Sequence, residues 1–162
     1  MQALIGPLKE LAEYEELCRN RTKGPGMIRI SGCVNSQKTH MMYALSDGLK
    51  YKVIACSGES KAKQIYEEYR MLDAQTYFYP AKDLLFYQAD LRSKELVRQR
   101  MEVLQAVAWG APLTVVASFD AFMDSLLSKE QLGQRFLHIK NDSAIDMEDM
   151  LKKLTDLGYD RE

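Results

Sequence analysis

The stretch MIRISGCVNSQKT, residues 27–39, is the part of this chain that decides its expected fold. Met27 to Gly32 is short and mostly apolar, as strands are, while Asn35 to Leu49 carries apolar side chains at helical spacing. A strand, a glycine turn and a helix in this order open a βαβ unit. The stretch therefore predicts an α/β domain whose first strand covers residues 27–32.

The remaining sequence continues the alternation of strands and helices. The run from Lys52 to Cys56 is almost continuously apolar, which is typical of a strand buried on both faces of a parallel sheet. Alternation at such intervals predicts a mostly parallel sheet with helices on both faces. We expect further strands at residues 76–79, 113–118 and 136–140, and helices at residues 7–20, 60–72, 93–109, 119–127 and 145–157.

Composition and charge narrow the class of protein. The chain has 162 residues, of which 46% are hydrophobic and 28% charged, and this suits a globular domain with a substantial core. Its net charge of -1 provides no overall field that would attract nucleic acid or an anionic membrane. The three cysteines, Cys18, Cys33 and Cys56, form no CxxC pair. We therefore expect no zinc site and no disulfide framework, in keeping with a cytoplasmic location.

Targeting and membrane segments are not expected either. No apolar run approaches the roughly 18 residues of a membrane-spanning helix, and the first residues do not have the pattern of a signal peptide.

Gly32, Lys38 and Thr39 stand at the spacing of a Walker A phosphate-binding loop, GxxxxGK[ST]. The second glycine of that motif is replaced by Gln37. A side chain at this point adds a β-carbon where the backbone must approach a phosphate, and costs about 1–2 kcal/mol if the backbone is left-handed there. Three interpretations stay open: a decayed nucleotide loop, an unrelated turn between strand and helix, and a loop that still binds an anion at the helix N-terminus.

Hydrolysis of ATP would also require carboxylates that hold Mg²⁺ at the end of a strand. The strand at residues 113–118 ends at Ser118 without such a pair. Asp120 has no acidic neighbour and is expected to begin the next helix. The sequence therefore predicts no catalytic residue, no cofactor and no metal site in this chain.

A second candidate region is the basic run at residues 92–100. Its cations are Arg92, Lys94, Arg98 and Arg100, which can contact a phosphate backbone or a protein partner. More often such a run is the solvated face of a helix, here with Glu95 and Glu102 as ionic partners. The inner, apolar stripe of this predicted helix includes either Arg100 or Met101. The basic run is a candidate for weak contacts with nucleic acid or a protein partner.

Several stretches, in order along the chain, resemble the N-terminal module of bacterial transcription-repair coupling factors, the Mfd family. They are Ile30–Gly32 with Ser36–His40, Tyr79–Tyr87, the residues Ser93, Glu95, Arg98, Arg100, Met101 and Leu104, then Val115–Met123, and Leu151 with Leu154–Asp160. The excinuclease protein UvrB is similar in layout but keeps the glycine that Gln37 replaces. It also carries a long tyrosine-rich hairpin where this chain has only Gln88–Leu91. Both differences favour the coupling factor.

The resemblance implies a fold and a role. The family's module is a P-loop NTPase or helicase-like α/β domain with a degenerate loop, interrupted by a small α+β domain that binds UvrA. On this basis residues 1–26 are an N-terminal helix and linker, residues 27–135 the degenerate helicase-like domain, and residues 136–162 the truncated start of the UvrA-binding type of domain.

The whole coupling factor is an ATP-driven DNA translocase that displaces stalled RNA polymerase and recruits nucleotide excision repair, and its motor lies far downstream. The resemblance implies that this chain is a non-catalytic scaffold. Its expected partners are UvrA and the protein's own motor domains, while RNA polymerase and DNA are contacted by other domains and no membrane is involved. A P-loop ATPase or kinase whose loop tolerates Gln37 remains the alternative, as does a piece of the excinuclease protein UvrB.

Overall fold

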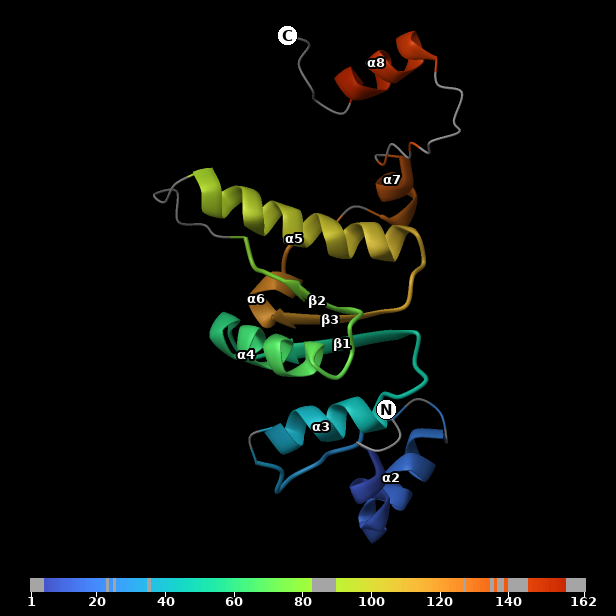
Figure 1. Ribbon diagram of the computed structural model, residues 1–162, viewed down its shortest axis with the longest axis vertical. Helices are drawn as coiled ribbons and strands as arrows, with labels where there is room; N and C mark the ends of the chain where they lie inside the picture. The colour runs from blue at the N-terminus through green and yellow to red at the C-terminus, as the bar shows by residue number, and fades with distance from the viewer. Residues whose placement is uncertain are drawn as a thin grey trace.

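A computed structural model describes residues 5–22, 24, 26–34, 36–82, 90–126, 128–134, 136, 139 and 146–156 (Figure 1). Its elements, in chain order, are the 3₁₀ helix η1 (Gly6–Glu10), α2 (Ala12–Thr22), α3 (Ser36–Leu45), β1 (Tyr51–Cys56), α4 (Glu59–Arg70), β2 (Thr76–Tyr79), α5 (Asp90–Ala108), β3 (Leu113–Ser118), α6 (Phe119–Phe122), α7 (Lys129–Gln134) and α8 (Met147–Asp156).

The strands form a parallel sheet in the order β1-β3-β2. Tyr51 of β1 is paired with Leu113 of β3, and Thr76 of β2 with Thr114 of β3. Every residue of β3 is buried, because this strand is central and both of its faces are covered. That position explains why residues 113–118 consist only of apolar and small polar side chains.

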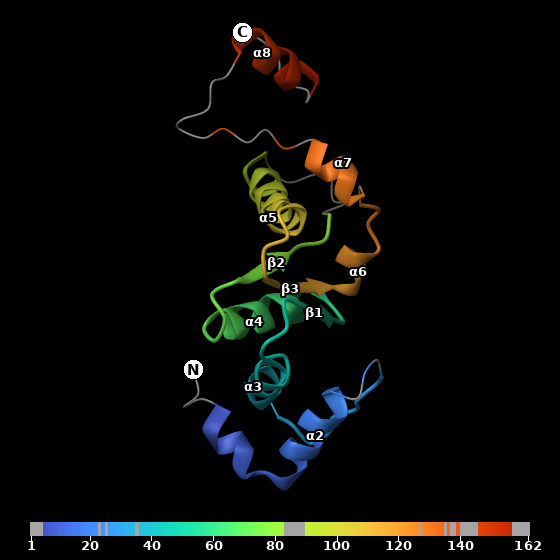
Figure 2. The same ribbon diagram turned by 90° about the vertical axis from the view of Figure 1, so that its right-hand side faces the viewer.

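Helices α4 and α5 cover opposite faces of the sheet, as Figure 2 shows. On the α4 face Ala62 packs with Cys56 and Val116, and on the α5 face Val103 and Ala106 pack with the other side of β3. The predicted α/β class, the parallel sheet and the helices on both faces are thereby confirmed.

One carboxylate joins the starts of the three strands. Asp73, between α4 and β2, accepts hydrogen bonds from Lys52 of β1 at 3.0 Å and from the Thr114 hydroxyl of β3 at 2.9 Å. It also accepts from the N–H of Gln75, just before β2, at 3.0 Å. Burial by itself raises the pKa of Asp73, but these hydrogen bonds together hold it below its ordinary value. The carboxylate is therefore ionised and acts as a fixed link within the sheet.

The structure corrects the prediction for residues 27–32. They belong to no strand, Gly32 lies in a bend, and Met27, Ile28 and Ile30 are exposed. Alternating apolar side chains are typical of a strand, but a strand must also pair with a neighbouring strand. Within the described residues β1 pairs with β3 alone, so residues 27–32 are not paired with it.

Other boundaries differ by smaller amounts. The first predicted helix is divided into η1 and α2, with the backbone of Leu11 extended between them. The predicted helix at 119–127 is only the short α6, and α7 follows it unpredicted. Helix α8 lies within the predicted residues 145–157. The strand predicted at 136–140 lies mostly outside the described residues, and the described positions 136 and 139 are not in a strand.

Among the described residues, no helix combines the length and the apolar character that crossing a membrane requires.

We predict that shortening Val116 destabilises the protein much more than the same change in Val53. Val116 is 0% exposed and Val53 66% exposed. Val116→Ala should lower the free energy of unfolding by about 2–3 kcal/mol, from lost burial plus the cavity that remains. Val53→Ala should change it by no more than about 0.5 kcal/mol. Urea denaturation of both variants checks this, and equal effects would contradict the burial described for β3.

Asp73→Asn should make the stability of the protein less dependent on acid pH. The lowered pKa of Asp73 contributes stability above the unfolded value of about 3.9, and this contribution is lost as the pH falls through the folded value. Above about pH 5 we expect the variant to lose about 1.5–3 kcal/mol, as for hydrogen bonds to a charged group. The loss should shrink below about pH 4. Asp156→Asn, an exposed change of equal charge, is the matched control and should change the free energy of unfolding by no more than about 0.5 kcal/mol at neutral pH.

Candidate functional site

The remnant of the phosphate loop leads into α3 (Ser36–Leu45). Gly32 has a φ of 88°, in the left-handed region where glycine carries no steric penalty. A β-carbon built on Gly32 would meet no heavy atom within 4 Å. The glycine is thus required by the backbone turn, and the loop does not fold tightly around a small enclosed space at this residue.

The side chain of Gln37 is used within the loop itself. Its Oε1 accepts a hydrogen bond from the backbone N–H of Val34 at 3.2 Å, and its own backbone N–H donates to the Val34 carbonyl at 3.0 Å. Free backbone N–H groups at this kind of turn are what a phosphate loop offers to an anion. Gln37 therefore occupies, from within the chain, one of the donors that an anion would use.

Thr39 points into the interface between α3 and α4. It is 3% exposed, and its hydroxyl donates to the Glu68 carboxylate of α4 at 2.7 Å. This hydrogen bond is the main reason that the pKa of Glu68 lies below its ordinary value, with a smaller contribution from Gln64. In an intact Walker A loop the hydroxyl at this position binds Mg²⁺. Here it joins two helices.

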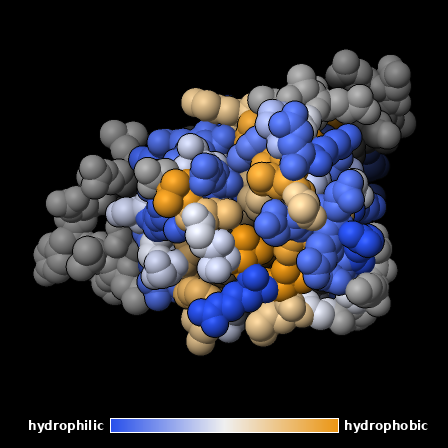
Figure 3. Space-filling view, turned by 90° about the horizontal axis from the view of Figure 1, so that it is seen from below, coloured by the Kyte–Doolittle hydropathy of each residue, from blue (hydrophilic) through white to orange (hydrophobic). Residues whose placement is uncertain are grey.

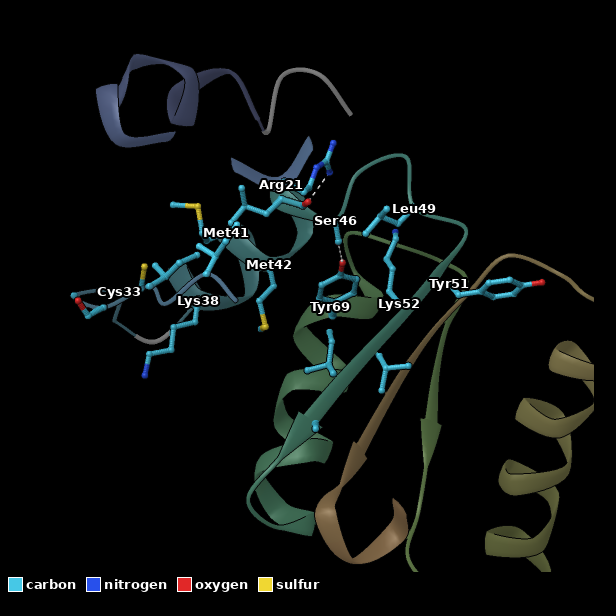
Figure 4. A pocket seen from close by; sticks show the side chains of 18 residues that line it. Arg21, Cys33, Lys38, Met41, Met42, Ser46, Leu49, Tyr51, Lys52 and Tyr69 are labelled. Atoms are coloured by element: carbon cyan, nitrogen blue, oxygen red, sulfur yellow. Dashed lines mark hydrogen bonds between the residues drawn. The ribbon is translucent and has the colours of Figure 1, made fainter. Parts of the chain in front are cut away.

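Lys38 is exposed and lies on the wall of a cavity of about 830 Å³ between α3, residues 28–33 and β1 (Figure 4). Gln37, Lys38 and Thr39 are therefore directed to three different surroundings: the loop, the cavity and the helix interface. The residues at the loop spacing are adjacent in the sequence, but the structure does not bring their side chains to one point.

The end of β3 is occupied by structural hydrogen bonds. Ser118 donates to the Glu59 carboxylate at 2.9 Å and accepts from the Ala121 N–H at 3.4 Å, which caps α6. Asp120 lies exposed in the first turn of α6, as predicted. Within the described part of the chain, no three His, Cys, Asp or Glu side chains are placed to hold a metal ion.

The basic run does not form one face. Arg98 is exposed and pairs with Glu95 and Glu102, and the hydrogen bond that it donates to Glu95 is the main cause that raises its pKa above the ordinary value. Arg100 is 9% exposed and donates to the Pro80 carbonyl at 2.8 Å. The side chains of Arg92 and Lys94 lie outside the described residues.

Arg100 has a structural role, although the sequence made it a candidate both for the basic surface and for the inner stripe of the helix. Its guanidinium lies 4.3 Å from the centre of the Tyr79 ring and 2.8 Å from the Asp124 carboxylate, an ion pair without the alignment of a hydrogen bond. Burial raises the pKa of Tyr79, with Arg100 opposing and Asp124 adding to the shift. The helical spacing from Leu96 to Arg100 was the signal that pointed inward.

Comparisons with known proteins agree with the resemblance seen in the sequence. The chain is similar to transcription-repair-coupling factors. The protein of that name from Staphylococcus aureus (strain bovine RF122 / ET3-1) is 24% identical over 167 aligned positions and matches 100% of this chain. Two from Staphylococcus epidermidis are 27% identical over 90 positions, or 56% of this chain.

These relatives are much longer proteins. The chain spans 14% of the length of the Staphylococcus aureus relative, and its match covers 8% of each Staphylococcus epidermidis relative. No family model matches the chain, and no solved structure matches it.

We predict that Glu68 and its neighbour Glu67 differ sharply in their contribution to stability. Glu68→Gln weakens the acceptor of the buried Thr39 hydroxyl and should cost about 0.5–1.5 kcal/mol at neutral pH. Because the folded pKa of Glu68 is lowered, its contribution is present above the unfolded value of about 4.3 and is lost as the pH falls through the folded value.

The matched control is Glu67→Gln, which removes the same charge from an exposed position on α4. It should change the free energy of unfolding by less than about 0.5 kcal/mol. Denaturant titrations at neutral pH and at pH values below the unfolded pKa measure both variants. Equal losses would show that the hydrogen bond from Thr39 contributes nothing.

Proposed function

We propose that this chain is the UvrB-like N-terminal module of a transcription-repair coupling factor and acts as a non-catalytic scaffold in transcription-coupled nucleotide excision repair. In this role it would bind other proteins rather than turn over a nucleotide. The proposed partners are UvrA and the motor domains of the same protein. The similarity to transcription-repair-coupling factors over the full chain supports the assignment to such a protein.

The observation that carries the non-catalytic part is the use of the loop side chains inside the chain. The side-chain oxygen of Gln37 accepts a hydrogen bond from the Val34 N–H, and the Thr39 hydroxyl donates a hydrogen bond to the Glu68 carboxylate. A nucleotide would have to break the first bond to reach the Val34 N–H, and Mg²⁺ would have to break the second to reach the hydroxyl. Breaking these two hydrogen bonds costs free energy, because the chain already provides well-placed partners for both groups.

The end of β3 supports the same proposal. Magnesium in nucleotide-hydrolysing sites is also held by a carboxylate at a strand end. Ser118 stands at that point here, and it is bonded to Glu59 and to the start of α6. Asp120, two residues further on, is exposed. We infer that the described part of the chain has neither half of a nucleotide-hydrolysing site.

The competing function is an ATPase whose loop tolerates Gln37. It is favoured by one observation: Lys38 is exposed on the wall of a cavity large enough for a small ligand. A piece of the excinuclease protein UvrB is a further alternative within the same repair process. That alternative is disfavoured because Gln37 stands where UvrB keeps a glycine.

Nucleotide titration separates the scaffold from the ATPase. With Mg²⁺ present, calorimetry should show no saturable ATP binding with a Kd below about 1 mM, which corresponds to a binding free energy of about −4.1 kcal/mol. Lys38→Ala should give the same trace. Micromolar, Mg²⁺-dependent binding that is lost in Lys38→Ala would reject the proposal. Gln37→Gly should not hydrolyse ATP, because the carboxylate at the strand end is still missing.

The scaffold itself is tested by protein binding. The immobilised chain should give a saturable response in surface plasmon resonance with UvrA or with the motor region of the Staphylococcus aureus relative. Lys63→Ala, an exposed change on α4 outside the candidate sites, serves as the control and should bind as the unchanged chain does. Lack of binding to both proteins would contradict the scaffold role even if the nucleotide result were negative.

A further inference from the structure

Strand β1 has one edge that carries no described strand. It pairs with β3 on one side only. The Lys50 carbonyl accepts from the Leu113 N–H at 3.0 Å, so residue 50 faces β3. Backbone groups alternate sides along a parallel strand. The N–H and C=O groups of Tyr51, Val53 and Ala55 therefore face away from β3, and all three residues are exposed.

A cavity lies against this edge. Its volume is about 830 Å³, and residues 51–55 line it consecutively, which places the edge of the strand along one wall. The opposite walls are mostly apolar and come from α3 and from the segment at 28–33, as Figure 4 shows in part. The apolar residues of these walls are Ile28, Ile30, Met41, Met42 and Leu45.

The same region is exposed as an apolar patch. Seen from the α2–α3 end, apolar side chains gather in the middle and hydrophilic ones surround them (Figure 3). Ile28 and Ile30, which line the cavity, are each 41% exposed. On β1, Tyr51 is 51% and Val53 66% exposed. Such grouped exposure is typical of a binding surface rather than of scattered apolar residues.

The size of the cavity suits one extended peptide. A strand residue takes up about 3.3 Å along the strand, about 4.8 Å across the sheet and about 10 Å between layers, hence about 160 Å³. The cavity therefore accommodates about five such residues, which equals the number of consecutive β1 residues on its wall. A row of unpaired N–H and C=O groups is matched best by another extended backbone.

Two features that protect free edges in other proteins are missing from residues 51–56. Prolines and unpaired lysines usually block such edges, but residues 51–56 contain no proline. The one charged residue among them, Lys52, forms an ion pair with Asp73 at 3.0 Å, and this pair holds its ammonium group away from the edge. The adaptable side chains of Met41 and Met42 on the facing helix are suited to a variety of apolar ligands.

Charge gives the ligand a direction. Helix α3 runs opposite to β1, so its first turn and Lys38 lie towards the end of β1 at Cys56 (Figure 1). A peptide that runs parallel to β1 would bring its C-terminal end to Lys38 and to the positive end of the helix. An acidic residue is favourable there.

We propose that the free edge of β1 binds, as a fourth parallel strand, an extended peptide segment of a partner protein: about five apolar residues followed by an acidic residue. The main chain of the peptide pairs with Tyr51, Val53 and Ala55. Its apolar side chains fill the cavity against α3 and residues 28–30. This binding surface is separate from the proposed scaffold role and does not depend on it.

Two synthetic peptides test the proposal on the intact chain. One has five alternating valines and isoleucines followed by two aspartates, and the other has the aspartates first. We expect fluorescence anisotropy to give a Kd below about 100 µM for the first peptide and at least about tenfold weaker binding for the second. Lys38→Ala should reduce that difference.

Hydrogen exchange locates the peptide. Binding should slow exchange of the Tyr51, Val53 and Ala55 amides by about tenfold or more, and leave those of Lys52 and Ile54 unchanged. N-methylation of alternate peptide amides provides a control that does not alter the protein. Methyl groups on the amides that face β1 should abolish binding, and methyl groups on the other amides should not.

Three results would overturn the proposal. The first is that the peptide does not bind, or that its affinity does not depend on which of its amides are methylated. The second is tighter binding of the peptide that begins with aspartates. The third is strong protection of Val53 and Ile30 amides in the free chain, which would show that the chain's own residues 27–31 already fill the edge.

Discussion

The carboxylate of Asp73 is the interaction on which the sheet depends. A parallel sheet has no tight hairpins to fix the relative positions of its strands, so the starts of the strands must be aligned by other contacts. Asp73 provides them by binding Lys52 of β1 and Thr114 of β3 while it leads into β2. With the strand starts aligned, the buried residues of β3 meet α4 on one face and α5 on the other.

The remnant loop shows how a motif can keep its spacing while its side chains take on structural work. Thr39 joins α3 to α4 through Glu68, and in the same interface Tyr43 packs edge-on against Tyr69. Tyr69 is 0% exposed and hydrogen-bonded to Ser46 at 2.7 Å. Thus α3 is held beside the sheet by its contacts with α4, while the segment that precedes it remains exposed.

Most of the fold was predictable, because strands and helices of this kind carry strong periodic signals. Residues 113–118 and α8 lie where the sequence places them. The segment at 27–32 was not predictable, since its alternation fits a strand but pairing depends on residues distant in the sequence. At the candidate site, the loss of the glycine at Gln37 was visible in the sequence. The partners of Gln37 and Thr39 were not, because side-chain hydrogen bonds leave no periodic signal and Glu68 is far along the chain.

The two arginines of α5 illustrate how differently neighbouring cations can be constrained. Arg98 extends into water and could be exchanged for lysine with little consequence. Arg100 uses the flat shape of its guanidinium to stack on Tyr79 while reaching both the Pro80 carbonyl and Asp124. A lysine has a single point charge and cannot satisfy these three neighbours together. Helix α5 thus combines a replaceable cation with one whose geometry, rather than charge, keeps the end of β2 in place.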